Sequence, residues 1–483
     1  MNVTHLSLHE LARALACGEL SSREITEQYL TEIYEKDSKI GAFLTVCADE
    51  ALRTADACDR ARTADPDRCG ALFGIPFALK DNLCTKGLRT TCASRMLEHF
   101  VPPYDATASA RLTEAGGILL GKLNLDEFAM GSSGEHSALA TTRNPVNLSY
   151  VAGGSSCGSA ASVAASLIPY ALGSDTGGSV RLPAAFCGVV GMRPTYGTVS
   201  RYGLVAFASS LDQIGPITKN VRDNATVLSA LVGRDPHDAT SLDHPSPDFC
   251  AELSKGVRGL RIGIPKEFFG EGCDEDVKTA VLHAADVLAS LGATLVPISL
   301  PIPNVALAAY YVLSSAEASS NLARFDGVRY GHRTSEYDNI EELYARSRAE
   351  GFGLEVKRRI LAGTHVLSVG YYNQYYQKAA LARTRVREDL LASLSVCDVI
   401  LSPTAPSVAY RAGERVEPMQ QMLTDRYAVP ASLAGLPALS LPCGTGNNGM
   451  PIGMQLMGAP FSEGLLYRVG YAYECETKGG GSL

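Results

Sequence analysis

Several patterns that would indicate a metal-binding, membrane or secreted protein are missing from this chain of 483 residues. Its thirteen cysteines form no C-x-x-C pair and no His/Cys cluster at zinc-ligand spacing, which argues against a structural zinc site. An odd, scattered set of cysteines is typical of reduced thiols in a cytosol. No apolar run approaches about 18 residues, and no charged segment followed by an apolar one opens the chain. We therefore expect a cytoplasmic protein without membrane contact.

An excess of basic residues is also missing. The formal net charge is −8 at pH 7, which argues against a broadly basic surface for nucleic acid. A partner that holds the nucleic acid is compatible with this charge, so we expect any RNA contact to be indirect. Apolar residues, by contrast, are plentiful: they make up 46% of the chain, enough for one large domain or two ordinary ones.

The order of the predicted elements indicates a mixed α/β layer. Capping-box patterns at Ser7–Glu10 and Ser21–Glu24 open two helices. Further helices are expected at 48–64, 107–114, 222–231, 275–291 and over most of 305–386, and strands at 117–120, 260–264, 293–298, 399–402, 438–441 and 452–457. A turn is expected at 212–216. A surface linker is expected at 234–256, where prolines lie among aspartates and serines.

Two glycine-serine clusters lie about one helix apart in the stretch Val151–Arg181. The second cluster, Ser174–Ser179, reads S-D-T-G-G-S, and consecutive glycines let a backbone turn several N–H groups inward. Such donors can hold an oxyanion beside a serine hydroxyl, an effect typically worth about 3 kcal/mol per donor. Either cluster alone could also be an ordinary loop, because glycine and serine form turns. The pair predicts a site for acyl chemistry.

A base for such a serine is suggested by Lys80, which ends the apolar, strand-like run from Gly74 to Leu79. Burial would lower the pKa of this lysine by disfavouring its ammonium form, and a neutral lysine can accept a proton. Taken alone, Lys80 fits equally well as a strand-end lysine that points into solvent.

Two other motifs in the sequence match known catalytic or binding patterns only in part. Gly116–Leu123 nearly matches the phosphate-binding loop, but Leu123 stands where a Mg²⁺-binding hydroxyl is required, so a turn and a buried strand are the better account. Gly154–Gly158 fits G-x-S-x-G, which would make Ser156 the nucleophile. That arrangement needs a late histidine, and the last histidine, His365, lies in a helical pattern.

The Gly153–Ser156 cluster, the Gly177–Ser179 cluster and the preceding Lys80, in their order and spacing, resemble the amidase signature family over residues 51–473. The resemblance implies a triad of Ser179 as nucleophile, Ser155, held by a cis peptide, as proton relay, and Lys80 as base.

On the same hypothesis, the backbone N–H groups of Thr176, Gly177, Gly178 and Ser179 stabilise the oxyanion. Cys157 departs from the glycine that is more common in the family, and we expect a small change in loop packing there.

The implied fold is one large α/β domain, residues 66–475, with a central mixed β-sheet covered by helices on both faces. Residues 1–65 are expected to form a helical segment packed on this domain. Residues 476–483 are expected to be a flexible tail.

Three further stretches resemble one branch of the family, the glutaminase subunits of tRNA-dependent amidotransferases: Gly191–Gly197, Ala316–Gly327 and Glu350–Arg359. The resemblance implies that glutamine is hydrolysed and that its ammonia passes to a partner protein. That partner amidates Glu-tRNA(Gln), and often Asp-tRNA(Asn), using ATP. The resemblance further implies that this chain holds no cofactor and that ATP and Mg²⁺ act at the partner. It also implies a heterotrimer with subunits B and C, in which aminoacyl-tRNA is bound mainly by the partner subunit.

Free glutamine carries an α-carboxylate and an α-ammonium, so its pocket needs a cation and an anion placed apart. By similarity these are Arg359 and Asp425, with Tyr310 nearby, although the adjacent Arg358 could also face the pocket. In the family, the loop matching Leu125–Ser132 borders the active site. The alternative function is a stand-alone hydrolase of small amides. An inactive scaffold would be expected to lack a triad residue, and none is missing.

Overall fold

One mixed sheet of eleven strands runs through the part of the protein that the computed structural model describes, residues 3–65, 69–244, 248–415 and 417–477. The strand order is β1-β3-β2-β4-β6-β5-β10-β11-β9-β7-β8. The strands are β1 Phe43–Val46, β2 Pro76–Lys80, β3 Ile118–Leu123, β4 Tyr170–Asp175, β5 Val190–Arg193, β6 Gln213–Thr218, β7 Arg261–Pro265, β8 Thr294–Ile298, β9 Val399–Pro403, β10 Ala438–Thr445 and β11 Pro451–Met457. Strand β2 pairs in parallel with β3 and β4, and β7 with β8 and β9, whereas the other pairs are antiparallel.

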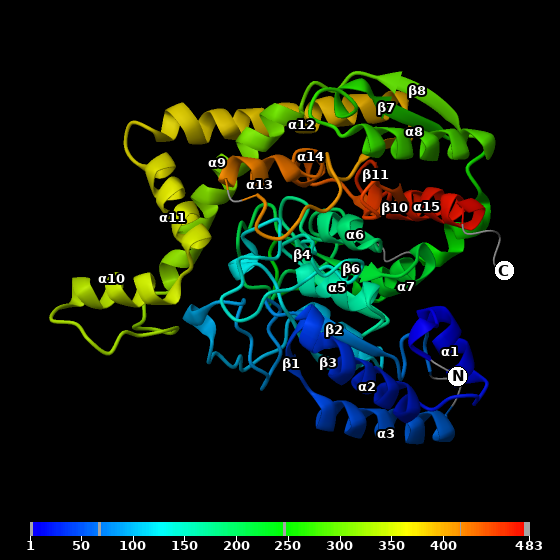
Figure 1. Ribbon diagram of the computed structural model, residues 1–483, viewed down its shortest axis with the longest axis horizontal. Helices are drawn as coiled ribbons and strands as arrows, with labels where there is room; N and C mark the ends of the chain where they lie inside the picture. Colours follow the sequence, from blue (N-terminus) through cyan, green and yellow to red (C-terminus); the bar gives the residue numbers. More distant parts are fainter. Residues whose placement is uncertain (1–2, 66–68, 245–247, 416, 478–483) are drawn as a thin grey trace.

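Helices flank this sheet, and α10 and α11 project away from it on the left of Figure 1. The helices are α1 Leu8–Ala16, α2 Ser22–Ile40, α3 Ala48–Ala64, α4 Thr107–Glu114, α5 Cys157–Ala164, α6 Arg181–Cys187, α7 Val221–Leu231, α8 Glu275–Ser290, α9 Pro303–Asn321, α10 Ile340–Gly351, α11 Leu354–Leu367, α12 Gln377–Val396, α13 Pro418–Thr424, α14 Val429–Ala434 and α15 Glu463–Thr477. None of the helices in the described ranges is long and apolar enough to cross a membrane.

Both faces of the sheet are covered, as the alternation of side chains along β9 shows. Val399 and Leu401 belong to a large hydrophobic cluster that also contains residues of α8 and α15. Ile400, between them, belongs to a second cluster with residues of α9, α12 and α14. Because successive side chains of a strand point to opposite faces, the two clusters lie on opposite sides of the sheet. The predicted α/β fold with a central mixed sheet covered on both faces is confirmed.

The capping-box predictions at the first two helices are also confirmed. Ser7 accepts a hydrogen bond from the backbone N–H of Glu10, whose carboxylate accepts in return from the backbone of Ser7, and Ser21 and Glu24 repeat the arrangement at α2. Buried residues of α1, α2 and α3 share the first hydrophobic cluster with residues of β2, β3 and β4. The division into a segment 1–65 and a domain 66–475 stays a prediction.

The predicted turn at 212–216 is wrong. Residues Gln213–Thr218 form β6, a strand in the middle of the sheet, in which Pro216 lies opposite Leu172 of β4. A proline normally argues against a central strand because it lacks an N–H donor. Here β5 pairs with β6 only at Ile217 and Thr218. Asn224 donates its side-chain N–H to the Pro216 carbonyl at 3.1 Å, so pairing and packing outweigh the local turn signal.

Two boundaries also need correction. Residues 245–247 of the predicted linker lie outside the described residues, but Phe249–Lys255 forms a 3₁₀ helix whose Phe249 and Leu253 are buried, so this part packs on the core. At the C-terminal end, α15 continues to Thr477 and takes in the first two residues of the predicted tail. The rest of that tail, 478–483, lies outside the described residues.

Candidate active site

The sheet brings the two predicted halves of the site to one edge. Strand β2 ends at Lys80 and β4 ends at Asp175, and the two strands pair in parallel through Leu79 and Leu172. Because parallel strands end at the same edge of a sheet, the lysine meets the loop that follows β4. Helix α5, which follows Ser156, packs next to β4 and adds the first glycine-serine cluster.

The Lys80 side chain is fully buried and bonded, not pointing into solvent. Its Nζ donates to Ser155 Oγ at 2.7 Å, to Ser156 Oγ at 3.0 Å and to Ser174 Oγ at 3.0 Å. Burial lowers the pKa of Lys80 to about 8, against the opposing effect of the nearby carboxyl groups of Asp126, Asp175 and Asp212. A neutral lysine is therefore accessible near physiological pH beside the hydroxyl of Ser155.

Ser155 is held from its backbone side by Asp126. The Gly154–Ser155 peptide is cis, as the resemblance implied. The N–H of Asp126 donates to the Ser155 carbonyl at 3.1 Å. The Asp126 carboxylate accepts from the N–H groups of Gly134 at 3.1 Å and His136 at 3.0 Å, which ties the loop after β3 to the serine. Sequence reasoning did not identify Asp126, because its function depends on this loop closure.

Ser179 stands in the short turn between β4 and α6 and is 8% exposed. The N–H of Ser156 donates to the Ser179 carbonyl at 3.1 Å, which joins the two glycine-serine clusters directly. Ser179 therefore lies next to the residues that surround Lys80, at a position that solvent reaches.

The shape of the Ser179 turn is set by Asp175. Its carboxylate accepts from the N–H groups of Gly178 at 3.0 Å and Val180 at 3.2 Å, and from Arg181 Nε at 3.0 Å. The Gly178 N–H is thus directed at Asp175, and the place of Gly178 among the oxyanion donors stays a prediction. In the described part of the chain, the N–H groups of Thr176, Gly177 and Ser179 have no hydrogen-bond acceptor.

Two arginines neutralise Asp175 in the core. Arg181 and Arg193 are fully buried and lie 3.0 Å and 3.1 Å from its carboxylate. Burial alone would raise the pKa of Asp175, but the two guanidinium groups lower it below its ordinary value. The turn that carries Ser179 is therefore built on a buried ionic cluster, which the sequence did not reveal.

The three predicted glutamine-binding residues come from separate elements but lie together. Tyr310 of α9 packs on the glycine turn, so closely that a Cβ on Gly177 would be 2.4 Å from its Cζ. The next residue, Tyr311, donates its hydroxyl to Asp425 Oδ2 at 2.7 Å, and its ring lies 4.6 Å below the Arg359 guanidinium. Tyr311 was missed, because the sequence does not tell which of two adjacent tyrosines faces a site.

Asp425 is buried and accepts a second hydrogen bond from Ser132 Oγ at 3.0 Å. Burial raises its pKa to about 7, although the hydrogen bonds from Tyr311 and Ser132 and the Arg359 charge act in the opposite direction. Ser132 belongs to the loop expected to border the active site, and it thus lies beside a predicted substrate-binding residue.

The side chains of Arg359 and Arg358 differ in exposure to solvent. The Arg359 side chain is 7% exposed, whereas that of Arg358 is 47% exposed. Arg359 Nε donates to Glu355 at 2.7 Å, but its Nη1 is buried without a hydrogen-bond acceptor in the described residues. A cavity of about 260 Å³ is lined by Tyr311 and by both Arg358 and Arg359, but not by Tyr310, Asp425 or Ser179. An unpaired, buried guanidinium donor is what an incoming carboxylate would satisfy.

A sequence model of the amidase family, "Amidase", matches residues 24–467. The chain belongs to the amidase family. It is 52% identical over 479 residues to the A subunit of glutamyl-tRNA(Gln) amidotransferase from Thermoanaerobacter pseudethanolicus, covering 99% of this chain and 98% of that protein. It is 54% identical to the protein of the same name from Nostoc punctiforme, with 98% of each chain covered.

Two solved structures are also similar to this chain. The crystal structure of the A subunit of glutamyl-tRNA(Gln) amidotransferase from Thermotoga maritima matches with a TM-score of 0.82 and 41% identity over 98% of this chain and 95% of that one. A peptide amidase from Stenotrophomonas maltophilia matches with a TM-score of 0.83 and 32% identity over 99% and 98% of the two chains.

Cys157 of this amidase is fully buried at the start of α5. It lies against Gly134, where an added Cβ would be 2.7 Å from the Cys157 Cβ. Burial, and the nearby Asp126 charge, raise the pKa of the thiol to about 12. Cys157 is thus a neutral packing residue beside Lys80, and its expected effect on loop packing stays a prediction.

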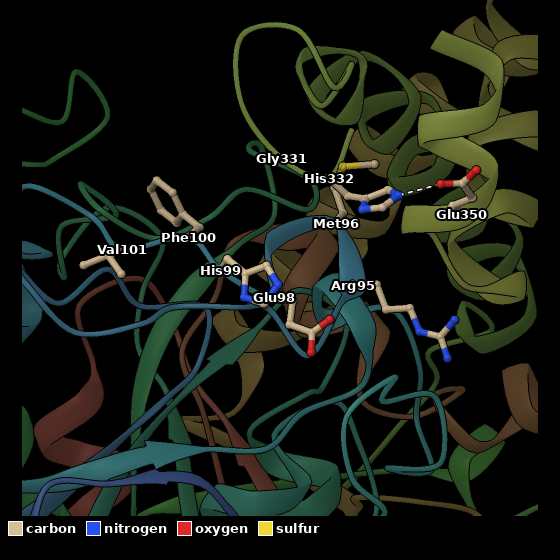
Figure 2. A pocket seen from close by; sticks show the side chains of 9 residues that line it. All are labelled: Arg95, Met96, Glu98, His99, Phe100, Val101, Gly331, His332 and Glu350. Carbon is tan, nitrogen blue, oxygen red and sulfur yellow. Dashed lines mark hydrogen bonds and ion pairs between the residues drawn. The ribbon is translucent and has the colours of Figure 1, made fainter. Parts of the chain in front are cut away.

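Another cavity of the amidase, of about 440 Å³, lies between Arg95–Val101 on one side and Gly331, His332 and, from α10, Glu350 on the other. Figure 2 shows its lining, in which His332 Nε2 pairs with Glu350 Oε2 at 2.7 Å. None of the predicted site residues lines this cavity. We therefore assign no step of acyl chemistry to it. No group of three or more His, Cys, Asp or Glu residues within the described ranges could hold a metal ion.

Proposed function

We propose that this amidase is the glutaminase component of a tRNA-dependent amidotransferase. The observation that carries the amidase chemistry is the contact of 2.7 Å between Lys80 Nζ and Ser155 Oγ, in a buried site where the pKa of the lysine is lowered to about 8. The names of the relatives support the tRNA-dependent part of the proposal. A buried lysine of that pKa, next to a serine and close to a glycine-rich turn, is suited to activate a nucleophile.

The proposed reaction is acyl transfer from the side-chain amide of glutamine. Ser179 Oγ attacks the amide carbon, Ser155 takes the Ser179 proton, and Ser155 passes its own proton to Lys80 Nζ. The N–H groups of the turn stabilise the oxyanion. The proton then returns to the leaving nitrogen, which departs as ammonia, and water hydrolyses the acyl-enzyme to glutamate.

Recognition of free glutamine is assigned to the residues around Tyr311. The unpaired Nη1 of Arg359 would bind the α-carboxylate, and Asp425 would bind the α-ammonium. Tyr310, which packs on Gly177, would separate the two charged groups from the reacting amide.

The partner follows from the names of the relatives, which are A subunits of glutamyl-tRNA(Gln) amidotransferases. We propose that ammonia is passed to such a complex, with subunits B and C, and that it serves the conversion of Glu-tRNA(Gln) to Gln-tRNA(Gln). ATP and Mg²⁺ would act at the partner, and this chain would need no cofactor of its own.

The test is ammonia release from glutamine by the purified chain, with and without the partner subunits, ATP and Glu-tRNA(Gln). Release that rises with the complete set is expected. Fast release by the chain alone, with other amides preferred, would instead indicate a stand-alone amidase. Mass spectrometry should detect a glutamyl adduct that Ser179→Ala abolishes, and persistence of that adduct would remove Ser179 as the nucleophile.

A further inference from the structure

Lys80 is bonded to three hydroxyl groups, and only one of them belongs to the proposed triad. Ser155 Oγ lies 2.7 Å from Nζ, and Ser156 Oγ and Ser174 Oγ each lie 3.0 Å away. All three serines are almost fully buried. A fourth oxygen, the Ser174 carbonyl, lies farther away, 3.4 Å from Nζ, so the closest contacts of the lysine are the three hydroxyl groups.

Ser174 is in turn held by Asn82, two residues beyond Lys80. Asn82 Nδ2 donates to Ser174 Oγ at 2.9 Å, and both residues are buried. Ser174 lies on β4, the strand that pairs with β2, so this hydrogen bond links the two strands beside the lysine. Neither residue has a place in the proposed reaction, yet both lie in its immediate surroundings.

The direction of the hydrogen bonds around Ser156 is determined by the backbone. Ser156 Oγ donates to the Ser174 carbonyl at 3.2 Å and accepts from the Ser174 N–H at 3.3 Å. With its hydrogen donated, Ser156 can only accept from Lys80. Ser174 Oγ accepts one hydrogen bond from Asn82 and one from Lys80. These two hydrogen bonds use both lone pairs of the Ser174 oxygen.

A neutral lysine has two N–H bonds and one lone pair. We propose that Ser174, held by Asn82, is a positioning residue for the proton relay: with Ser156 it takes both N–H bonds of neutral Lys80, so that the lone pair faces Ser155. The O–H bond of Ser155 can then break as an N–H bond forms on Lys80, while Ser155 receives the proton of Ser179. This inference rests on the proposed function.

Removal of the Ser174 hydroxyl makes a specific prediction. A neutral Lys80 would then direct an N–H toward Ser155 for part of the time, in the wrong direction for accepting a proton. In Ser174→Ala we expect kcat for ammonia release from glutamine to fall at least about ten-fold, with KM changed less than about two-fold. The acid limb of the kcat/KM pH profile should move to lower pH, because the ammonium form loses one acceptor.

If Ser174→Ala only loosened the packing, the acid limb of the pH profile would move to higher pH. Loosened packing would admit water and return Lys80 toward the ordinary pKa of a lysine. The ionisable groups that act on Lys80, namely Cys157, Asp126, Asp175 and Asp212, stay the same in this variant. A matched control is Ser159→Ala, because Ser159 is a buried serine of α5 that also bonds to β4, through the Leu172 carbonyl at 3.0 Å, but does not touch Lys80.

The experiment compares the complete amidotransferase complex carrying wild-type chain, Ser174→Ala, Asn82→Ala, Ser159→Ala or Ser179→Ala. Asn82→Ala acts without a change in β4 and should lower kcat about three- to ten-fold, which gives a second test if Ser174→Ala does not fold. An unchanged kcat in the folded Ser174→Ala or Asn82→Ala variant, or an acid limb moved to higher pH, would overturn this inference alone. No glutamine-dependent ammonia from the wild type, or full activity in Ser179→Ala, would overturn the proposed function with it.

Discussion

Replacement of Arg359 by alanine, compared with the same change at Arg358, tests how glutamine is recognised. The two residues are neighbours on α11, but the Arg359 side chain is 7% exposed and carries a buried Nη1 without an acceptor in the described residues, whereas that of Arg358 is 47% exposed. If Arg359 binds the α-carboxylate, only its removal should weaken glutamine binding.

The magnitude follows from the contacts. A hydrogen bond to a charged group contributes about 1.5 to 3 kcal/mol, and the buried site places Arg359 at the upper end of that range. About 3 kcal/mol corresponds to a rise of roughly 100-fold in KM for glutamine. Arg358 is the exposed partner of its ion pair with the buried Glu355, 3.6 Å away, so we expect a change of less than about three-fold for Arg358→Ala.

The assay is ammonia release from glutamine and from 4-aminobutanamide, which is glutamine without its carboxylate. The wild type should discriminate strongly between the two, and Arg359→Ala should lose most of that discrimination while its Tm shows that it is folded. Equal effects of the two replacements on KM, or a discrimination that survives Arg359→Ala, would refute the assignment.

Three further predictions concern charge. Because Lys80 must be neutral to accept a proton and its pKa is about 8, kcat/KM should rise with pH through about 8, and a limb near the ordinary lysine value would contradict its role as base. Asp425 has a pKa raised to about 7 and should be ionised only above that pH, so the KM for glutamine should increase as pH falls through 7. The KM for glutaramate, which lacks the α-ammonium, should show no such increase. The same pH dependence of KM for both substrates would exclude Asp425 as the ammonium-binding residue. Asp175→Asn leaves Arg181 and Arg193 without their counter-charge, so we expect the free energy of unfolding, measured by urea titration, to fall by about 3 to 5 kcal/mol. A fall of less than about 1 kcal/mol would show that the ionic cluster is not needed for stability.

Much of the fold could be predicted, because the local sequence of most elements indicates whether they are helices or strands. The capping boxes of α1 and α2 and the charged, alanine-rich pattern of α3 are local signals. Strand β6 could not be predicted, because Pro216 is a turn signal in the sequence and becomes a strand residue only through its partners β4 and β5. The 3₁₀ helix Phe249–Lys255 is a similar case, since its two apolar residues become significant only when packed.

The candidate site divides in the same way. The sequence indicates three of the site residues, Lys80, Ser155 and Ser179, because their spacing and glycine neighbours carry the family resemblance. Asp126 and Asp175 are not, because each is an ordinary aspartate until a loop closes around it or a buried arginine approaches it.

On the proposed assignment of the site residues, the two hydrophobic clusters on the faces of the sheet separate the chemistry of this protein from its selectivity. The proposed triad comes from residues 80–179, next to strands whose apolar side chains fill the first cluster, whereas Tyr310 belongs to the second, on the helix pair that also carries Arg359. Selectivity can therefore diverge by replacement of side chains on α9 and α11 while β2, β4 and their serines are retained. For engineering, the reaction can be kept as one unit while the choice of amide is changed, which makes α9 and α11, together with Asp425 after α13, the place to begin in redirecting the enzyme to another substrate.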